Sequence, residues 1–375
     1  MEKTAKIVME KIKIIHKNSG ISILKNTPIS SPLYPGQFCY CLDEMQWFEK
    51  YGNFVDIAIG DNFQKIQPAI RMRDFENFYC RDVNGNGQHL GLFTLATIAG
   101  GKVIGVDSAR TCYEGIVRTM LDFFIAIGLD QSRIKVTYFS GNTASNIEMS
   151  RKKEKQERKV LVDAYIDEDC LRDTFSKCGL MENQLEGVDT RDNYLTSNWY
   201  NIVVPWGYRN EFLYLLPNGQ WLDIGTIERL NMIPIITIQN KESYVVNLRE
   251  WDRSLFISVV GLERLIAAIE EADDILYISL LKLLKRVGTM SNRKSEALRI
   301  LHRVFTDVEW KDLSKSKRGL ANFLFRSLEN LPLPVISDFL QLHAGQYEFL
   351  FPELFGGIER TLAEIEAYRK RAGLW

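Results

Sequence analysis

A strand and a helix meet in Ser254-Leu-Phe-Ile-Ser-Val-Val-Gly-Leu-Glu-Arg264-Leu-Ile266. The residues before Gly261 are almost continuously apolar, which is typical of a strand covered on both faces. After Gly261, leucine and isoleucine recur at the spacing of an amphipathic helix, at Leu262, Leu265, Ile266 and Ile269. The stretch predicts a central strand that turns through glycine into a helix whose first turn carries Arg264.

Two apolar runs upstream predict an antiparallel hairpin. They are Ile66–Arg73 and Leu90–Ile98, and Asn84-Gly-Asn-Gly87 lies between them. Asparagine and glycine favour the backbone conformations of tight hairpin turns. Residue spacing predicts further strands at Ile134–Phe139, Ile202–Val204, Glu211–Leu216 and Ile235–Ile238, and helices at residues 5–16 and 109–127.

The C-terminal part of the chain has a different period from the rest. Beyond about residue 275 the apolar residues keep helical spacing, with interruptions near Asn330–Pro334 and Phe351–Gly357. The sequence thus predicts two domains. Residues 1–275 form an α+β domain with a mostly antiparallel sheet flanked by helices, and residues 276–375 form an all-α domain.

The composition excludes several classes of protein. Of 375 residues, 46% are hydrophobic and 25% charged, as in ordinary globular domains and unlike disordered chains. The 47 Lys and Arg against 48 Asp and Glu leave no overall basic field that would indicate a nucleic-acid partner. No run approaches the ~20 apolar residues of a membrane span and no signal peptide is evident, so we expect a cytoplasmic protein. The six cysteines form no CxxC pair, which argues against a disulfide framework or a zinc site.

Three stretches that lie far apart in the sequence point together to one known family of proteins. They are Ser31-Pro-Leu-Tyr-Pro35 with Met45-Gln-Trp-Phe48, Gln67-Pro-Ala-Ile-Arg71 with His89-Leu-Gly-Leu-Phe93, and Val260-Gly-Leu-Glu-Arg264-Leu265. Together they resemble motifs 1, 2 and 3 of class II aminoacyl-tRNA synthetases. The closest resemblance is to the catalytic core of alanyl-tRNA synthetase, which implies a class II antiparallel sheet flanked by helices.

Other segments extend this resemblance over most of residues 5–370. Asn198-Trp199 and Pro205-Trp-Gly207-x-x-x-Glu211-x-x-Tyr214 resemble a stretch of the catalytic core of that family, without its cysteines. The segments similar to the tRNA-recognition helices of the family are Leu313-Ser-Lys-Ser-Lys-Arg318-Gly319, Phe325-Arg326 and Phe351-Pro-Glu-Leu354.

The resemblance implies an ATP site. Arg71 would bridge the α-phosphate and the acyl carboxylate, for which the planar fork of arginine is suited. Phe93 would offer an aromatic face to adenine, and His89 a polar contact at the phosphates. Arg264, at a helix start that favours anions, would hold the terminal phosphate, and Glu211 would lie on the nucleotide or Mg²⁺ side. The alternative interpretation is a surface arginine and a core phenylalanine.

The pattern breaks where the family binds its amino acid. An aspartate of the family that reads the α-ammonium is replaced by Ile257, and the substrate-contacting asparagine falls near Thr226. Asp223 or Glu228 could restore an ammonium contact. Trp199, Asp223, Thr226 and Ile257 are the predicted substrate pocket. Because a pocket that lacks its polar reader selects a different class of substrate, the change argues against alanine itself.

The sequence therefore predicts an ATP- and Mg²⁺-dependent ligase that adenylates an amino or carboxylic acid. The acyl acceptor is a tRNA or, in a stand-alone paralogue, a carrier, peptide or small amine. Acceptor contacts are predicted at Arg293, Arg299, Arg303, Lys317, Arg318 and Arg326, although each alone also fits a solvated helix face. The alternative is a non-catalytic RNA-binding or regulatory paralogue. A monomer and a homodimer both fit the sequence.

Overall fold

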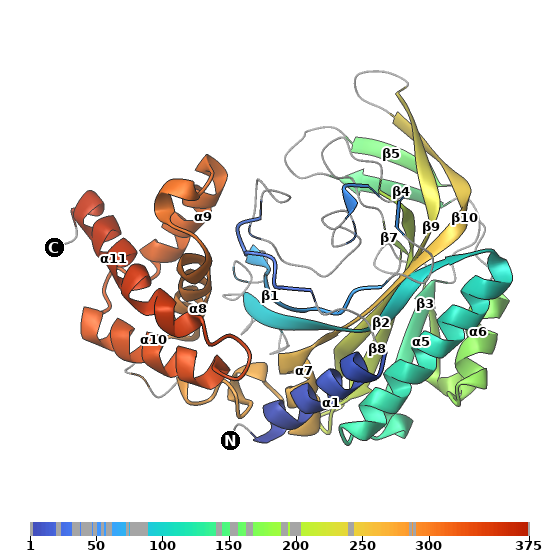
Figure 1. Cartoon of the computed structure of the whole chain (residues 1–375), viewed down its shortest axis with the longest axis horizontal. Coiled ribbons are helices and arrows are strands. Elements are labelled where there is room, and N and C mark those ends of the chain that lie inside the picture. The colour runs from blue at the N-terminus through green and yellow to red at the C-terminus, as the bar shows by residue number, and fades with distance from the viewer. Residues whose placement is uncertain are drawn as a thin grey trace.

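The computed structural model describes the chain at residues 3–19, 24–31, 38, 47, 51–53, 56–57, 62–72, 75, 89–139, 145–150, 157–162, 168–188, 194–195, 204–238, 244–284, 287 and 290–373. Over these residues a curved sheet lies beside a bundle of C-terminal helices (Figure 1). The predicted α+β class, a mostly antiparallel sheet flanked by helices and followed by a helical region, is confirmed. None of the described helices is long and apolar enough to cross a membrane.

The main sheet contains eight of the described strands, and β7 pairs with β8 at its side. Its bounds are β1 (Ile66–Ile70), β2 (Leu92–Ile104), β3 (Ile134–Phe139), β6 (Leu185–Val188), β7 (Tyr194–Leu195), β8 (Trp206–Leu215), β9 (Trp221–Ile238) and β10 (Tyr244–Gly261). The strand order is β1-β2-β10-β9-β8-β3-β6, and only the pair of β3 and β6 is parallel. A separate hairpin joins β4 (Ser145–Ser150) to β5 (Glu157–Val162).

The strand predicted at residues 254–260 is the last part of β10, which begins ten residues earlier at Tyr244. It lies between β2 and β9, and its side chains are buried on both faces, with Phe256 and Val260 on one face and Leu255 and Ile257 on the other. At Gly261 the strand ends and α7 (Leu262–Ile269) begins without a connecting loop. The predicted hairpin is also present, because β1 and β2 pair antiparallel with Ile70 opposite Leu92.

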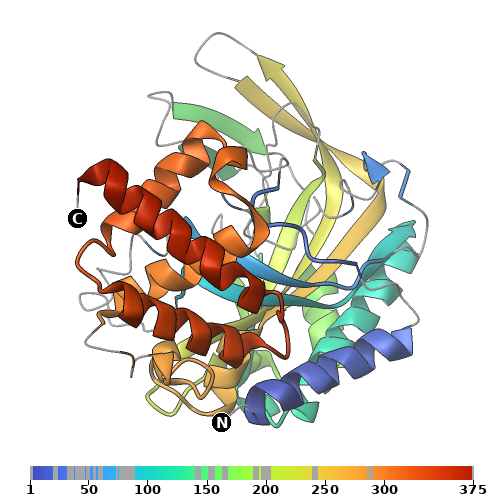
Figure 2. The ribbon, with the colours of Figure 1, turned by 60° about the vertical axis from the view of Figure 1, so that its left-hand side comes forward.

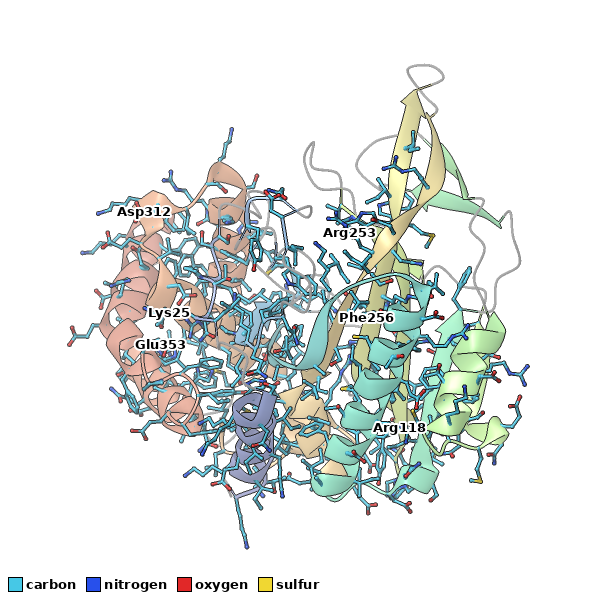
Figure 3. The ribbon with its side chains drawn as sticks, turned by 45° about the vertical axis from the view of Figure 1, so that its right-hand side comes forward. Lys25, Arg118, Arg253, Phe256, Asp312 and Glu353 are labelled. Carbon is cyan, nitrogen blue, oxygen red and sulfur yellow. The ribbon has the colours of Figure 1, made fainter. Side chains whose placement is uncertain are left out.

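Helices cover one face of the sheet. They are α1 (Lys3–Ser19), α5 (Val106–Ala126), α6 (Glu168–Lys177) and α7, and they lie together on the convex side of the sheet in Figure 1. Phe256 of β10 lies between the sheet and α5 (Figure 3). Within the main apolar core its ring stacks on that of Tyr113 in α5, with 6.0 Å between the ring centres. This burial is the main force that holds helices and sheet together.

The opposite face of the sheet, here called the inner face, carries Leu255 and Ile257 of β10. These side chains belong to a second apolar cluster that also contains Trp47, Ile57, Phe63, Val204 and Leu230. The strand predicted at Ile202–Val204 lies mostly outside the described residues. Val204 itself is not in a strand but packs into this cluster.

The helical region consists of α8 (Asn292–Asp307), α9 (Lys315–Arg326), α10 (Leu333–Tyr347) and α11 (Leu354–Ala372). Figure 2 shows these helices in front of the sheet, at the end where β1 lies. The main apolar core continues from the helix-covered face of the sheet into this bundle. The same apolar core contains residues from both sides of position 275. The predicted division of the chain into two domains at this position therefore stays a prediction.

Candidate active site

Arg71 and Phe93 lie together at one end of the β1–β2 hairpin. Arg71 directly follows β1, and its backbone N–H donates to the carbonyl oxygen of Gly91 at 2.9 Å. Its guanidinium carbon is 5.6 Å from the centre of the Phe93 ring, a cation–π distance. The Arg71 side chain is exposed and Phe93 is half-buried. The arginine and aromatic ring predicted for ATP are therefore neighbours.

Arg264 lies in the first turn of α7 and contacts two of the residues considered for the site. It forms an ion pair with the carboxylate of Asp223 in β9, and Nη1 also donates to the Asp223 carbonyl oxygen at 3.2 Å. Its Nη2 is 3.4 Å from Nδ1 of His89, which accepts because arginine only donates. All three side chains are half-buried, where ion pairs are less screened than at a free surface.

The sheet register places these two groups at the same end of β2. Gly261, three residues before Arg264, is opposite Leu95, and Leu95 follows Phe93 by two residues. We call Arg71, His89, Phe93 and Arg264 the phosphate end. These four residues come close together only because β1, β2 and β10 pair in this order. Local sequence alone could not bring them together.

Glu211 and Thr226 lie on β8 and β9, two of the inner strands of the sheet. They are directly opposite each other on β8 and β9, and Thr226 is opposite Val259 on β10. Glu211 forms an ion pair with Arg209 at 3.2 Å, and both side chains are partly exposed. The structure thus brings the carboxylate predicted for the nucleotide or Mg²⁺ side next to the residue predicted for the substrate.

Ile257 is packed rather than open to a ligand. Its side chain is 2% exposed within the second apolar cluster. Across the strand from it is Gly100, where an added Cβ would lie 2.5 Å from the Phe256 carbonyl oxygen, so the backbones approach closely. On its other side Glu228 occupies the directly opposite position on β9. We call Thr226, Glu228 and Ile257 the acyl end, and Trp199, predicted for the same pocket, lies outside the described residues.

Asp223 contacts Arg264, and its role toward a substrate stays a prediction. The sequence suggests it as a contact for a substrate ammonium, but its carboxylate is engaged by Arg264. A register shift between β8 and β9 places Leu213 opposite Asp223 and Phe212 opposite Gly225, which separates Asp223 from the Glu211–Thr226 row. Asp223 therefore belongs with the phosphate end rather than with the acyl end.

The surface role predicted for three basic residues of the helical region is wrong. Arg299, Arg303 and Lys317 are only 2%, 4% and 3% exposed. Arg299 forms a buried ion pair with Glu296 at 2.7 Å, and Arg303 forms ion pairs with Asp307 and Glu353. The Lys317 ammonium donates to the carbonyl oxygen of Ser31 at 3.0 Å. These side chains hold the protein together, because a buried charge must be paired to be tolerated.

The other three predicted acceptor contacts differ in exposure. Arg293 is half-buried, with its guanidinium 5.0 Å from the Phe75 ring. Arg318 is half-buried and donates to the carbonyl oxygen of Lys311 at 2.7 Å. Arg326 is exposed at the end of α9. Among the six, Arg326 is the most exposed, and Arg293 and Arg318 remain partly accessible.

Sequence inspection missed a buried polar group beside the phosphate end. Glu263, Glu296 and Arg299 are buried and bond to the first residues of β2. The buried Tyr347 hydroxyl donates to Glu263. Burial raises the pKa of the Glu263 carboxyl above its usual range. Glu263 directly precedes Arg264 in Val260-Gly-Leu-Glu-Arg264-Leu265. Glu296, Arg299 and Arg303 share one face of α8, a spacing that could have indicated a buried charge cluster.

Mg²⁺ is usually held by one or two carboxylates together with substrate phosphates. Within the described part of the chain, no group of three or more His, Cys, Asp or Glu side chains could hold a metal ion. The partly exposed Glu211 on the inner face is consistent with the minimal kind of site that Mg²⁺ uses with a nucleotide.

Comparison with known proteins gives only distant similarity. No protein-family model matches the sequence, and no curated protein matches it. The apo histidyl-tRNA synthetase of S. aureus has a TM-score of 0.39 and 12% identity, over 73% of this chain and 68% of that one. The RNA-binding domain of threonyl-tRNA synthetase from Cryptosporidium parvum Iowa II has a TM-score of 0.40 and 13% identity, over 72% and 64%. Similarity at this level decides neither the family nor the activity of this chain.

Proposed function

We propose that the chain is an ATP-dependent ligase that activates an amino or carboxylic acid as its acyl adenylate. The observation that carries this proposal is the assembly of the phosphate end. Residues separated by as many as 193 positions, from Arg71 to Arg264, meet at one end of β2 with an aromatic ring beside one arginine and an imidazole beside the other. Two arginines suit the phosphates of a nucleoside triphosphate, and an aromatic ring suits its base.

The chemistry we propose needs no side-chain nucleophile. The carboxylate of the acid attacks the α-phosphorus of ATP, and pyrophosphate leaves. Arg71, exposed and beside Phe93, bridges the carboxylate and the α-phosphate and stabilises the charge that develops on the phosphorus. Arg264 holds the terminal phosphate, which requires it to exchange part of its bonding with Asp223 for the phosphate oxygens. Holding both reactants in place supplies most of the acceleration.

Mg²⁺ would be held on the side of Glu211 together with the phosphates. When bound, it supplies charge neutralisation and orientation of the phosphate oxygens. Glu211 already forms a partly exposed ion pair with Arg209, so it can contribute a carboxylate without leaving a buried charge unpaired.

For the acid, we propose that Glu228 rather than Asp223 contacts any cationic group. Asp223 is engaged by Arg264, and Ile257 offers no polar atom. Glu228 lies on the same sheet row as Ile257, directly across from it. Glu228 is half-buried, so a substrate can contact its carboxylate although the neighbouring Ile257 side chain is closed off. The acceptor stays a prediction, tRNA or a carrier, peptide or small amine, with Arg326 as the exposed candidate contact.

ATP–pyrophosphate exchange across a panel of amino acids, including D- and β-forms, and simple carboxylic acids tests this proposal. Exchange with one acid is expected, and transfer of its label to bulk tRNA in the same reactions would identify tRNA as the acceptor. ATP binding with no exchange for any acid would contradict the ligase.

A second candidate, a non-catalytic RNA-binding or regulatory paralogue, is favoured by one observation. Ile257 is closed off in an apolar cluster at the place where the related family reads its amino acid. This candidate predicts ATP or RNA binding without exchange, so the same assay separates the two.

A further inference from the structure

The first residues of β2 extend beyond the strand that flanks them. β10 pairs with β2 as far as Gly261 opposite Leu95 and then turns into α7. The backbone groups of Leu92 and Thr94 on that side therefore have no strand partner. A buried backbone group without a hydrogen bond would be costly, so other atoms must take the place of the strand.

Two carboxylates occupy that place. The backbone N–H of Thr94 donates to Oε2 of Glu263 at 2.8 Å, and its hydroxyl donates to Oε1 at 3.0 Å. The backbone N–H of Leu92 donates to Oε1 of Glu296, in α8, at 2.6 Å. Bonds from N–H groups to carboxylates are stronger than bonds to neutral acceptors, so these side chains fix the end of β2 firmly.

Arg299 and Tyr347 join the two carboxylates to each other. Arg299 pairs with Glu296 at 2.7 Å and donates to the carbonyl oxygen of Leu92 and to the Tyr347 hydroxyl, at 2.9 and 3.0 Å. The Tyr347 hydroxyl, at the end of α10, donates to Oε1 of Glu263 at 3.0 Å. A small cavity of about 10 Å³ lies among these residues, and they are otherwise closely packed.

The same backbone carries the phosphate end. Phe93 lies between Leu92 and Thr94, whose N–H groups the network holds, and Arg264 directly follows Glu263. We propose that Glu263 and Tyr347 are positioning residues, which fix the ATP-binding ring and arginine and couple them to the helical region. This inference rests on the proposed function. Because coupling is reciprocal, ATP binding must also stabilise α10 against the sheet.

Tyr347→Phe tests the coupling, with Tyr368→Phe as its matched control. Tyr368 also donates its hydroxyl to a glutamate of the helical region, Glu329 at 3.1 Å, but it does not belong to the network. Tyr347→Phe is expected to weaken ATP binding by up to roughly ten-fold, because the free energy of the lost hydrogen bond to Glu263 limits the coupling that it can transmit, and to speed hydrogen exchange at Thr94. The Michaelis constant for the acid should stay unchanged, and Tyr368→Phe should leave ATP binding unchanged.

Hydrogen exchange of the wild-type protein gives a second test that needs no variant. ATP should slow exchange in residues 92–94 and in α10, but not in α5. Protection of residues 92–94 without α10, or equal ATP affinity in wild type and Tyr347→Phe, would overturn the coupling and leave the proposed function intact. Absence of ATP binding to the wild type would overturn both.

Discussion

The phosphate end and the acyl end lie on one sheet, yet they are built differently. At the phosphate end, cationic and aromatic side chains project from strand and helix ends and remain partly accessible. At the acyl end, Ile257 is sealed by aromatic and aliphatic side chains, among them Trp47 and Phe63. In the function we propose, nucleotide binding and substrate choice depend on separate parts of the sheet, so that one can change while the other stays.

The largest expected effect is at the phosphate end. Arg71→Ala and Arg264→Ala should each lower ATP–pyrophosphate exchange by roughly a thousand-fold, because each removes a cation that stabilises charge on the phosphates. Chemical denaturation should show little change in the free energy of unfolding, since neither side chain is fully buried. Arg118→Ala, an exposed arginine paired with Glu114 on α5, is the control and should retain activity. Full activity in both arginine variants would show that the phosphate end does not bind the phosphates, and the proposed difference between the two ends would be lost.

The next largest effect should come from a charge at the acyl end. Ile257→Asp is expected to lower the free energy of unfolding by about 3 kcal/mol, because it buries a carboxylate among apolar groups. Ile257→Val, which keeps the apolar contacts, should cost only about 1 kcal/mol. Urea denaturation measures both. An Ile257→Asp variant as stable as wild type would show that this end is open to solvent, contrary to the packing described.

Acidification should lower the stability of the helical region, which bonds to the start of β2 at the phosphate end. Burial lowers the pKa of His302 from 6.5 to about 4, and His343, whose Nδ1 is 2.9 Å from that of His302, is lowered as well. Because the unfolded chain binds these protons more readily, stability is complete above about pH 6.5 and falls as pH drops toward 4.

For His302 alone the loss between pH 7 and pH 5 should be about 2 kcal/mol. Urea denaturation at several pH values measures it. In His302→Gln this share of the pH dependence should disappear. If the free energy of unfolding changed with pH equally in wild type and His302→Gln, the description of His302 and His343 as a buried, uncharged pair would be contradicted.

The smallest effect should distinguish the two carboxylates of β9. If the substrate is an amino acid, Glu228→Gln should lower its preference over the analogue without an amino group by roughly ten-fold, since a buried ammonium loses its charged partner. Asp223→Asn should leave that preference unchanged, because Asp223 contacts Arg264. Exchange assays with both acids measure the ratio. A loss of preference in Asp223→Asn alone would reverse the assignment.

Much of the fold follows from residue spacing. The apolar run before Gly261 and the helical spacing after it predict the end of β10 and the start of α7, because burial on both faces and the helical period leave direct marks in the sequence. The extension of β10 back to Tyr244 leaves no such mark. It depends on pairing with β9, whose partner residues are set by the tertiary fold.

The site could be predicted only in part. A motif pattern identifies Arg71 and Arg264 as candidates, but not that Asp223 engages Arg264, because that contact depends on a register shift between β8 and β9. Likewise, a charged helix face looks the same in sequence whether it meets water or another element. Arg299 and Arg303 bond to β2 and to Glu353 instead of meeting solvent, and this required the packed structure.

Calorimetric titration of ATP into wild type, Arg71→Ala and Arg264→Ala, with Arg118→Ala as control, tests the central claim most directly. We expect saturable binding to wild type and to Arg118→Ala, and greatly weakened binding to the other two variants. Equal affinity in all four proteins, or no binding to any, would contradict the assignment of the phosphate end as a nucleotide site.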